Sequence, residues 1–74
     1  MCRKFDVESF GKRLLSLRIG KDIDAKKLGK ALGVTHQTIY RWENGTRRPT
    51  IDNIFEIADF FVVSVTYLLG LSEK

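Results

Sequence analysis

The sequence predicts an all-α fold, a single domain of five short helices over residues 1–74 with a flexible N-terminal arm at residues 1–6. Two observations favour this class. Apolar residues recur three and four positions apart, and no stretch alternates between apolar and polar side chains as a half-buried strand does. In addition, each apolar-periodic segment follows a residue that caps helix N-termini, and these caps are Asp6, Asp24, Thr35, Thr50 and Ser64.

The first two helices are each closed by a glycine. The first covers residues 7–19 and ends at Gly20, and its apolar side consists of Phe10, Leu14 and Leu17. The second covers residues 25–32 and ends at Gly33, where a left-handed backbone is needed. Its inner residues are expected to be Leu28, Ala31 and Leu32.

Three further helices follow. The third covers residues 36–43 and stops at Asn44, and a loop over residues 45–49 separates it from the fourth helix, which covers residues 51–61. The fifth helix covers residues 65–69 and precedes a glycine. The apolar side of the fourth helix is expected to consist of Ile51, Ile54, Phe55, Ala58 and Phe61.

The charge distribution indicates a polyanionic partner. The chain has 13 Lys and Arg residues against nine Asp and Glu residues. Residues 1–50 hold 12 basic and 5 acidic side chains, whereas residues 51–74 hold one basic and four acidic side chains. We therefore expect a basic front that faces the polyanion and an acidic back.

Metal, membrane and enzymatic functions are not expected. One Cys and one His cannot build a structural metal site, and the longest apolar run, residues 60–63, is far shorter than the roughly 20 residues of a membrane span. There is no secretory signal, so the expected location is the cytoplasm. Neither a Gly-rich phosphate loop nor a nucleophile at a dyad spacing from His36 is present, so no cofactor and no catalysis are expected.

The second and third helices are joined as in a helix-turn-helix. The turn Leu32-Gly33-Val34-Thr35 is short and contains glycine, which suits two helices set at about 90–120°. Side chains with the chemistry to bind bidentately to guanine and adenine edges gather on the outward side of the third helix. At about 100° per residue, this side holds Gln37, Tyr40, Arg41 and Asn44, flanked by His36 and Thr38, while Ile39, Trp42 and Glu43 face inward.

The run from Leu28 to Gly45, LGKALGVTHQTIYRWENG, followed by Arg47-Arg48-Pro49-Thr50, resembles the lambda-repressor-like (Cro-type or XRE) helix-turn-helix family. The resemblance covers residues 7–71. It implies a five-helix domain that places the third helix in the major groove of double-stranded DNA. It also implies a transcriptional regulator of the repressor or controller type.

The resemblance further implies which residues contact DNA. The base-reading positions are His36, Gln37 and Arg41, with Tyr40 beside them in reach of a base or of the backbone. Ala25 stands where the family commonly has Gln, and Gly29 where it usually has Ala. The positions expected to bind phosphate are Thr35, Thr38, Asn44, Arg47, Arg48 and Lys26, the last of these in compensation for Ala25.

Arg18 and Glu43 are charged residues on the apolar sides of the first and third helices, and the resemblance points to the same pair. We interpret them as partners that fix the angle of the third helix, because charged side chains are rarely buried unless they are paired. Two charges at a solvated rim are the alternative. Trp42 is assigned to the core, where its indole N–H needs an acceptor.

A homodimer on a pseudo-palindromic operator is expected. One reading helix covers few base pairs, and a core of this length contributes only about 3–5 kcal/mol, so an interface adds both specificity and stability. The interface is assigned to the least basic surface, with Phe60, Tyr67 and Leu71. The alternative function is a protein-binding module of the same fold, an antitoxin or adaptor, with an apolar patch in place of a base-reading face.

Overall fold

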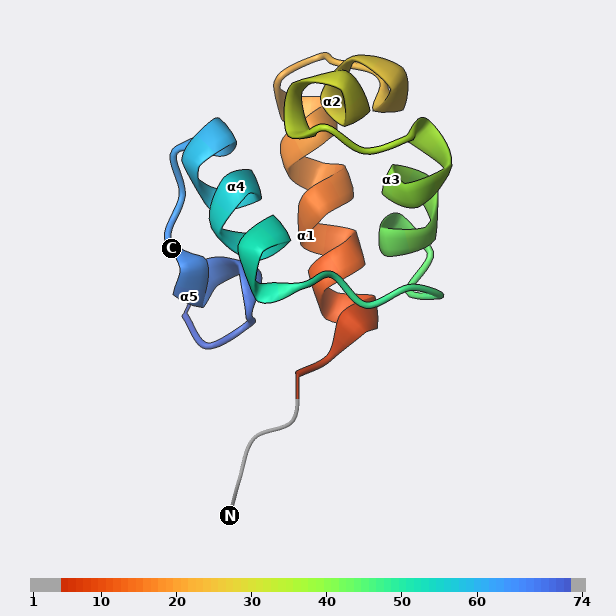
Figure 1. The fold of residues 1–74 in the computed structure, drawn as a ribbon. Helices are drawn as coiled ribbons and strands as arrows, with labels where there is room; N and C mark the ends of the chain where they lie inside the picture. The colour runs from red at the N-terminus through yellow and green to blue at the C-terminus, as the bar shows by residue number, and fades with distance from the viewer. Residues whose placement is uncertain (1–4, 73–74) are drawn as a thin grey trace.

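The computed structural model describes residues 5–72 as a bundle of short helices, with no β-strand in that range. The helices are α1 (Val7–Gly20), α2 (Ala25–Leu32), α3 (His36–Glu43), α4 (Ile51–Phe61) and α5 (Val65–Leu68). In Figure 1, α1 runs through the centre, α2 lies at its upper end, and α3 and α4 lie on opposite sides of it, with α5 below α4. The predicted all-α architecture of five helices is confirmed.

The helix starts follow from the predicted caps. The side chains of Asp6, Asp24, Thr35, Thr50 and Ser64 each accept a hydrogen bond from a backbone N–H in the first turn of the helix that follows. Two helix ends differ from expectation. Helix α1 includes Gly20, and the chain turns instead at Asp22 (φ 55°), because a short Asp side chain tolerates the left-handed region. Helix α5 ends one residue early, at Leu68.

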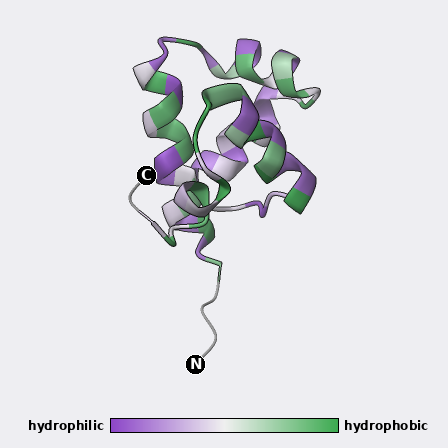
Figure 2. Ribbon diagram, turned by 90° about the vertical axis from the view of Figure 1, so that its left-hand side faces the viewer, coloured by the Kyte–Doolittle hydropathy of each residue, from purple (hydrophilic) through white to green (hydrophobic). Residues whose placement is uncertain are grey.

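A single cluster of apolar side chains from all five helices forms the core. Figure 2 shows hydrophobic and hydrophilic residues alternating around the helices, as expected of elements that each bury one side. The buried members are Phe10, Leu14, Ala25, Leu28, Leu32, Ile39, Trp42, Ile54, Ile57, Ala58, Phe61 and Leu68.

Three residues assigned to the core are in fact exposed. Ala31 faces solvent on α2, and on α4 the side chains of Ile51 and Phe55 are 58% and 52% exposed. Ile57, which was not assigned to the apolar side of α4, is fully buried. The buried side of α4 is therefore rotated about the helix axis from the expected one. Helix α4 carries apolar residues on more than one side, and packing against the other helices determines which side is buried.

Two glycines allow the backbones around α3 to approach closely. A Cβ atom on Gly11 would lie 2.3 Å from the carbonyl oxygen of Trp42, so α1 meets the backbone of α3 directly. A Cβ atom on Gly29 would lie 2.7 Å from the carbonyl oxygen of Val34. The alanine that is usual at Gly29 in the family that the sequence resembles would therefore require the turn between α2 and α3 to shift.

Of the N-terminal arm expected at residues 1–6, only Phe5 and Asp6 lie within the described residues. Residues 1–4 of the expected arm lie outside them. The ring of Phe5 packs against Phe10 with centroids 5.7 Å apart, and Asp6 caps α1. These two residues therefore belong to the folded domain, because an aromatic contact and a helix cap hold them in place.

Candidate nucleic-acid interface

Helix α3 is anchored by its buried side. Ile39 and Trp42 are 0% and 1% exposed, and α3 contacts both α1 and α2. The Trp42 ring meets Phe10 edge-on, with centroids 6.4 Å apart. The expected acceptor for the indole is not found, because Trp42 Nε1 is buried without a hydrogen-bond partner among the described residues.

Arg18 and Glu43 lie in bidentate contact between α1 and the end of α3. Arg18 Nε donates to Glu43 Oε2 at 2.6 Å and Arg18 Nη2 to Glu43 Oε1 at 3.1 Å. Arg18 Nη1 also donates to the carbonyl of Ile23 at 3.1 Å. The two side chains are only 15% and 6% exposed, so they lie inside the rim rather than on it. The hydrogen bond to Glu43 holds the pKa of Arg18 above its ordinary value, against the opposing effect of burial.

The outward side of α3 carries hydrogen-bonding side chains and no acid. The residues exposed there are His36, Gln37, Tyr40, Arg41 and Asn44, whereas Thr38, which was also expected to flank this side, is half-buried. The rings of His36 and Tyr40 meet edge to face, with centroids 6.0 Å apart at 86°. Tyr40 remains 47% exposed, so this aromatic pair is not buried and lies on the surface of α3 next to Gln37 and Arg41 in the sequence.

Thr35 and Thr38 together cap the start of α3. Thr35 Oγ1 accepts from the backbone N–H of Thr38 at 3.2 Å, and the two hydroxyl oxygens lie 3.0 Å apart. The hydroxyls thus hold the first turn in place. The first N–H groups of any helix have no partner within the helix, so the start of α3 presents donors suited to an anion.

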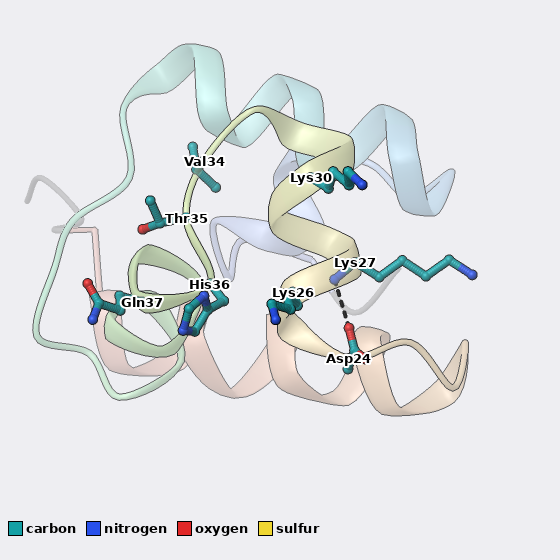
Figure 3. Close-up of a pocket in the computed structure, with 8 residues that line it drawn as sticks. All are labelled: Asp24, Lys26, Lys27, Lys30, Val34, Thr35, His36 and Gln37. Atoms are coloured by element: carbon teal, nitrogen blue, oxygen red, sulfur yellow. Dashed lines mark hydrogen bonds between the residues drawn. The ribbon is translucent and has the colours of Figure 1, made fainter.

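An open hollow of about 850 Å³ lies between α2 and the start of α3. Figure 3 shows the residues that line it, which are Asp24, Lys26, Lys27, Lys30, Val34, Thr35, His36 and Gln37. The Asp24 carboxylate accepts from the backbone N–H of Lys27 at 2.7 Å and caps α2. Lys27 and Lys30 were not assigned a role from the sequence, although their spacing from Lys26 indicates a cationic side of α2.

The loop after α3 is tied back to that helix. The carbonyl oxygen of Arg41 accepts from the backbone N–H groups of Thr46 at 2.9 Å and Arg47 at 3.3 Å. Arg47 and Arg48 are exposed beyond this anchor. The guanidinium carbon of Arg48 lies 5.2 Å from the centroid of the Phe5 ring, a cation–π distance. Phe5 is therefore a residue that the sequence reasoning missed, because only the fold brings it to this loop.

The three residues assigned to a dimer interface differ in accessibility. Phe60 is half-buried against Phe61, with ring centroids 5.0 Å apart. Tyr67 is half-buried under the guanidinium of Arg13, 5.4 Å from its ring centroid. Leu71 is 47% exposed and offers the most free apolar surface of the three.

Across residues 5–72, no group of three His, Cys, Asp or Glu side chains is arranged to hold a metal ion. The same part of the chain contains no helix long and apolar enough to cross a membrane.

The fold and this arrangement of α2 and α3 are those of a helix-turn-helix protein, and a helix-turn-helix family model matches residues 14–68. The chain therefore belongs to the helix-turn-helix family, in its lambda-repressor-like form. It is 33% identical over 64 residues to the HTH-type transcriptional activator BcrR of Enterococcus faecalis. That match covers 86% of this chain but only 31% of BcrR, so the chain spans about a third of this relative's length.

Two solved structures share the fold over most of both chains. The P22 c2 repressor protein, in complex with a synthetic operator, has a TM-score of 0.80 and 28% identity, covering 85% of this chain and 96% of the repressor. The restriction-modification controller protein C.AhdI from Aeromonas hydrophila has a TM-score of 0.77 and 27% identity, covering 85% and 91% of the two chains.

Proposed function

We propose that this chain is a sequence-specific, double-stranded-DNA-binding transcriptional regulator that reads the major groove with α3. The observation that carries the proposal is the outward side of α3, where five exposed residues with hydrogen-bonding side chains include no acid. Lysines line the hollow on one flank of this side. On the other flank lies the loop after α3 that carries Arg47 and Arg48, the arginine loop. A merely solvated helix of this charge-rich chain would be expected to carry carboxylates, as α4 does.

In this proposal the contacts divide into two kinds. Gln37 and Arg41 read base edges, because both side chains can form two hydrogen bonds to one base. His36 and Tyr40, paired at 6.0 Å, extend the same reading surface along the groove. Phosphates are bound around this surface by the start of α3 with Thr35 and Thr38, and by Lys26, Asn44, Arg47 and Arg48.

The names of two similar proteins support a DNA-binding, transcriptional role for this chain. The P22 c2 repressor, which shares the fold, was solved with a synthetic operator, and BcrR is named as a transcriptional activator. We infer that this chain also binds a pseudo-palindromic operator as a homodimer, since half-sites one helical turn apart, about 34–36 Å, require two reading helices. The proposed interface consists of Phe60, Tyr67 and Leu71, of which Leu71 is exposed.

The proposal is tested by titrating the chain against duplexes enriched from a random pool, at two salt concentrations. Each neutralised phosphate contributes about −0.9 to the slope of log affinity against log salt, so several phosphate contacts give a steep negative slope. An enriched, two-fold-related sequence together with this slope is the expected result. A pool that yields no enriched sequence, or an affinity that ignores salt, would contradict the proposal.

A further inference from the structure

We propose that the outer side of α4 is a docking surface for a partner protein that presents a basic amphipathic helix. This α4 surface consists of an apolar row, Ile51, Phe55 and Val62, and an acidic ridge beside it, Asp52, Glu56 and Asp59. Helices α3 and α4 lie on opposite sides of α1 (Figure 1), so the α4 surface does not overlap the outward side of α3. The inference therefore does not depend on DNA binding.

Ile51 and Phe55 are four residues apart and lie on one side of α4, and Val62 is the left-handed residue directly after its last turn. They are 58%, 52% and 84% exposed. Single exposed apolar residues are ordinary, but two on one side of a short helix and a third directly after it form a patch of the kind that marks interaction sites.

The acidic ridge gives this surface a defined charge. Asp52, Glu56 and Asp59 are exposed, and none of them forms an ion pair within residues 5–72. The chain carries no Lys or Arg from residue 49 to residue 72, so no basic side chain of the same segment neutralises the ridge. Its carboxylates are therefore available to cations from outside the domain.

Val62 is unfavourable in the isolated domain for two reasons. Its backbone is left-handed (φ 56°), a conformation that is strained for a β-branched residue, and its side chain is almost fully exposed. A glycine would suit the same position without strain, as Gly33 does at the end of α2. Neither backbone geometry nor burial within this domain favours valine here, whereas contact with a partner would.

The negative charge of the acidic ridge determines which kind of partner can bind the α4 surface. An acidic ridge repels DNA and anionic lipid, and a two-fold contact between two copies of this surface would place three carboxylates of one copy near three of the other. A helix with Lys or Arg beside apolar anchors complements both the ridge and the row. Amphipathic helices that dock on such surfaces bury anchors spaced three, four and seven residues apart, and Ile51 and Phe55 are spaced by four.

The test uses the full, isotope-labelled chain and a synthetic amphipathic helix of about 15 residues made of Leu and Lys. We expect backbone amide shifts to concentrate on residues 51–62 and to leave α3 unchanged. Phe55→Ser should weaken binding about tenfold by removing the half-exposed anchor. Glu56→Gln should weaken it about two- to fivefold, the effect of one exposed ion pair.

Asp22→Asn is the matched control, because it removes another exposed carboxylate far along the sequence from α4 and keeps a residue that tolerates the left-handed region. It should leave the affinity unchanged. Shifts spread over every acidic residue, or a Phe55→Ser variant that binds as tightly as the parent, would overturn the proposal. So would α4 shifts that depend on protein concentration before peptide is added, because a second copy would then be the occupant.

Discussion

Helices α3 and α4 are built on the same plan and differ on their outward sides. Each follows a threonine cap and buries one apolar stripe in the common core. Outward, α3 presents amide, imidazole, phenol and guanidinium groups without an acid, whereas α4 presents carboxylates and apolar side chains without a base. The buried stripes pack both helices into one core, and we infer that the outward residues decide which partner each side can bind.

The largest expected effect on stability is at Glu43, whose ion pair anchors the end of α3. Glu43→Ala would leave Arg18 partly buried without its carboxylate, which typically costs about 3–5 kcal/mol. We expect the free energy of unfolding, measured in urea, to fall by an amount in this range. Glu56→Ala on the outer side of α4 is the control and should change stability by less than about 0.5 kcal/mol. Equal effects of the two substitutions would contradict the assigned role of the ion pair.

The close approach of α1 to α3 is tested by two identical substitutions on one helix. In Gly11→Ala the new Cβ would lie 2.3 Å from the Trp42 carbonyl oxygen, and we expect a loss of about 3 kcal/mol in unfolding free energy. In Gly20→Ala the Cβ meets nothing within 4 Å, and we expect a gain of about 0.5–1 kcal/mol from helix propensity. A well-tolerated Gly11→Ala would show that α3 can move away from α1.

The arginine loop is tested through Phe5, which we regard as a positioning residue for Arg48. Phe5→Leu keeps an apolar side chain against Phe10 but removes the ring that lies under the guanidinium. A cation–π contact at an exposed site contributes about 0.5–1 kcal/mol, so DNA affinity should fall about two- to fivefold for every duplex alike. Phe5→Tyr keeps the ring and should retain the affinity of the parent. A change in base preference with either variant would argue against this role.

The smallest effect is expected at the end of α4. Val62→Gly relieves the left-handed strain, and after the entropy of the more flexible unfolded chain is subtracted it should stabilise the domain by about 0.5–1 kcal/mol. Val63→Gly, which lacks the strain and loses a partly buried side chain, should destabilise it. Thermal unfolding of the two variants measures both signs, and a destabilised Val62→Gly would contradict the interpretation of Val62.

Local signals predicted more of this structure than long-range ones. The five caps and the two sides of α3 follow from residues close together in the sequence, and they were predicted from it. The buried stripe of α4 was misplaced, because Ile51 and Phe55 are as apolar as Ile57 and only the packed neighbours distinguish them. The contact of Phe5 with Arg48 joins residues far apart in the sequence, so no periodicity reports it.

The central claim, that the outward side of α3 reads bases while the loop beside it binds phosphates, is tested most directly by repeating the duplex selection with Arg41→Ala and Arg48→Ala. Arg41→Ala should lose its preference at one position of each half-site, at a cost of about 1–3 kcal/mol for the preferred base pair. Arg48→Ala should weaken all sequences alike and reduce the salt slope by about 1. If both variants selected the parental sequence with reduced affinity, α3 would not read bases through Arg41.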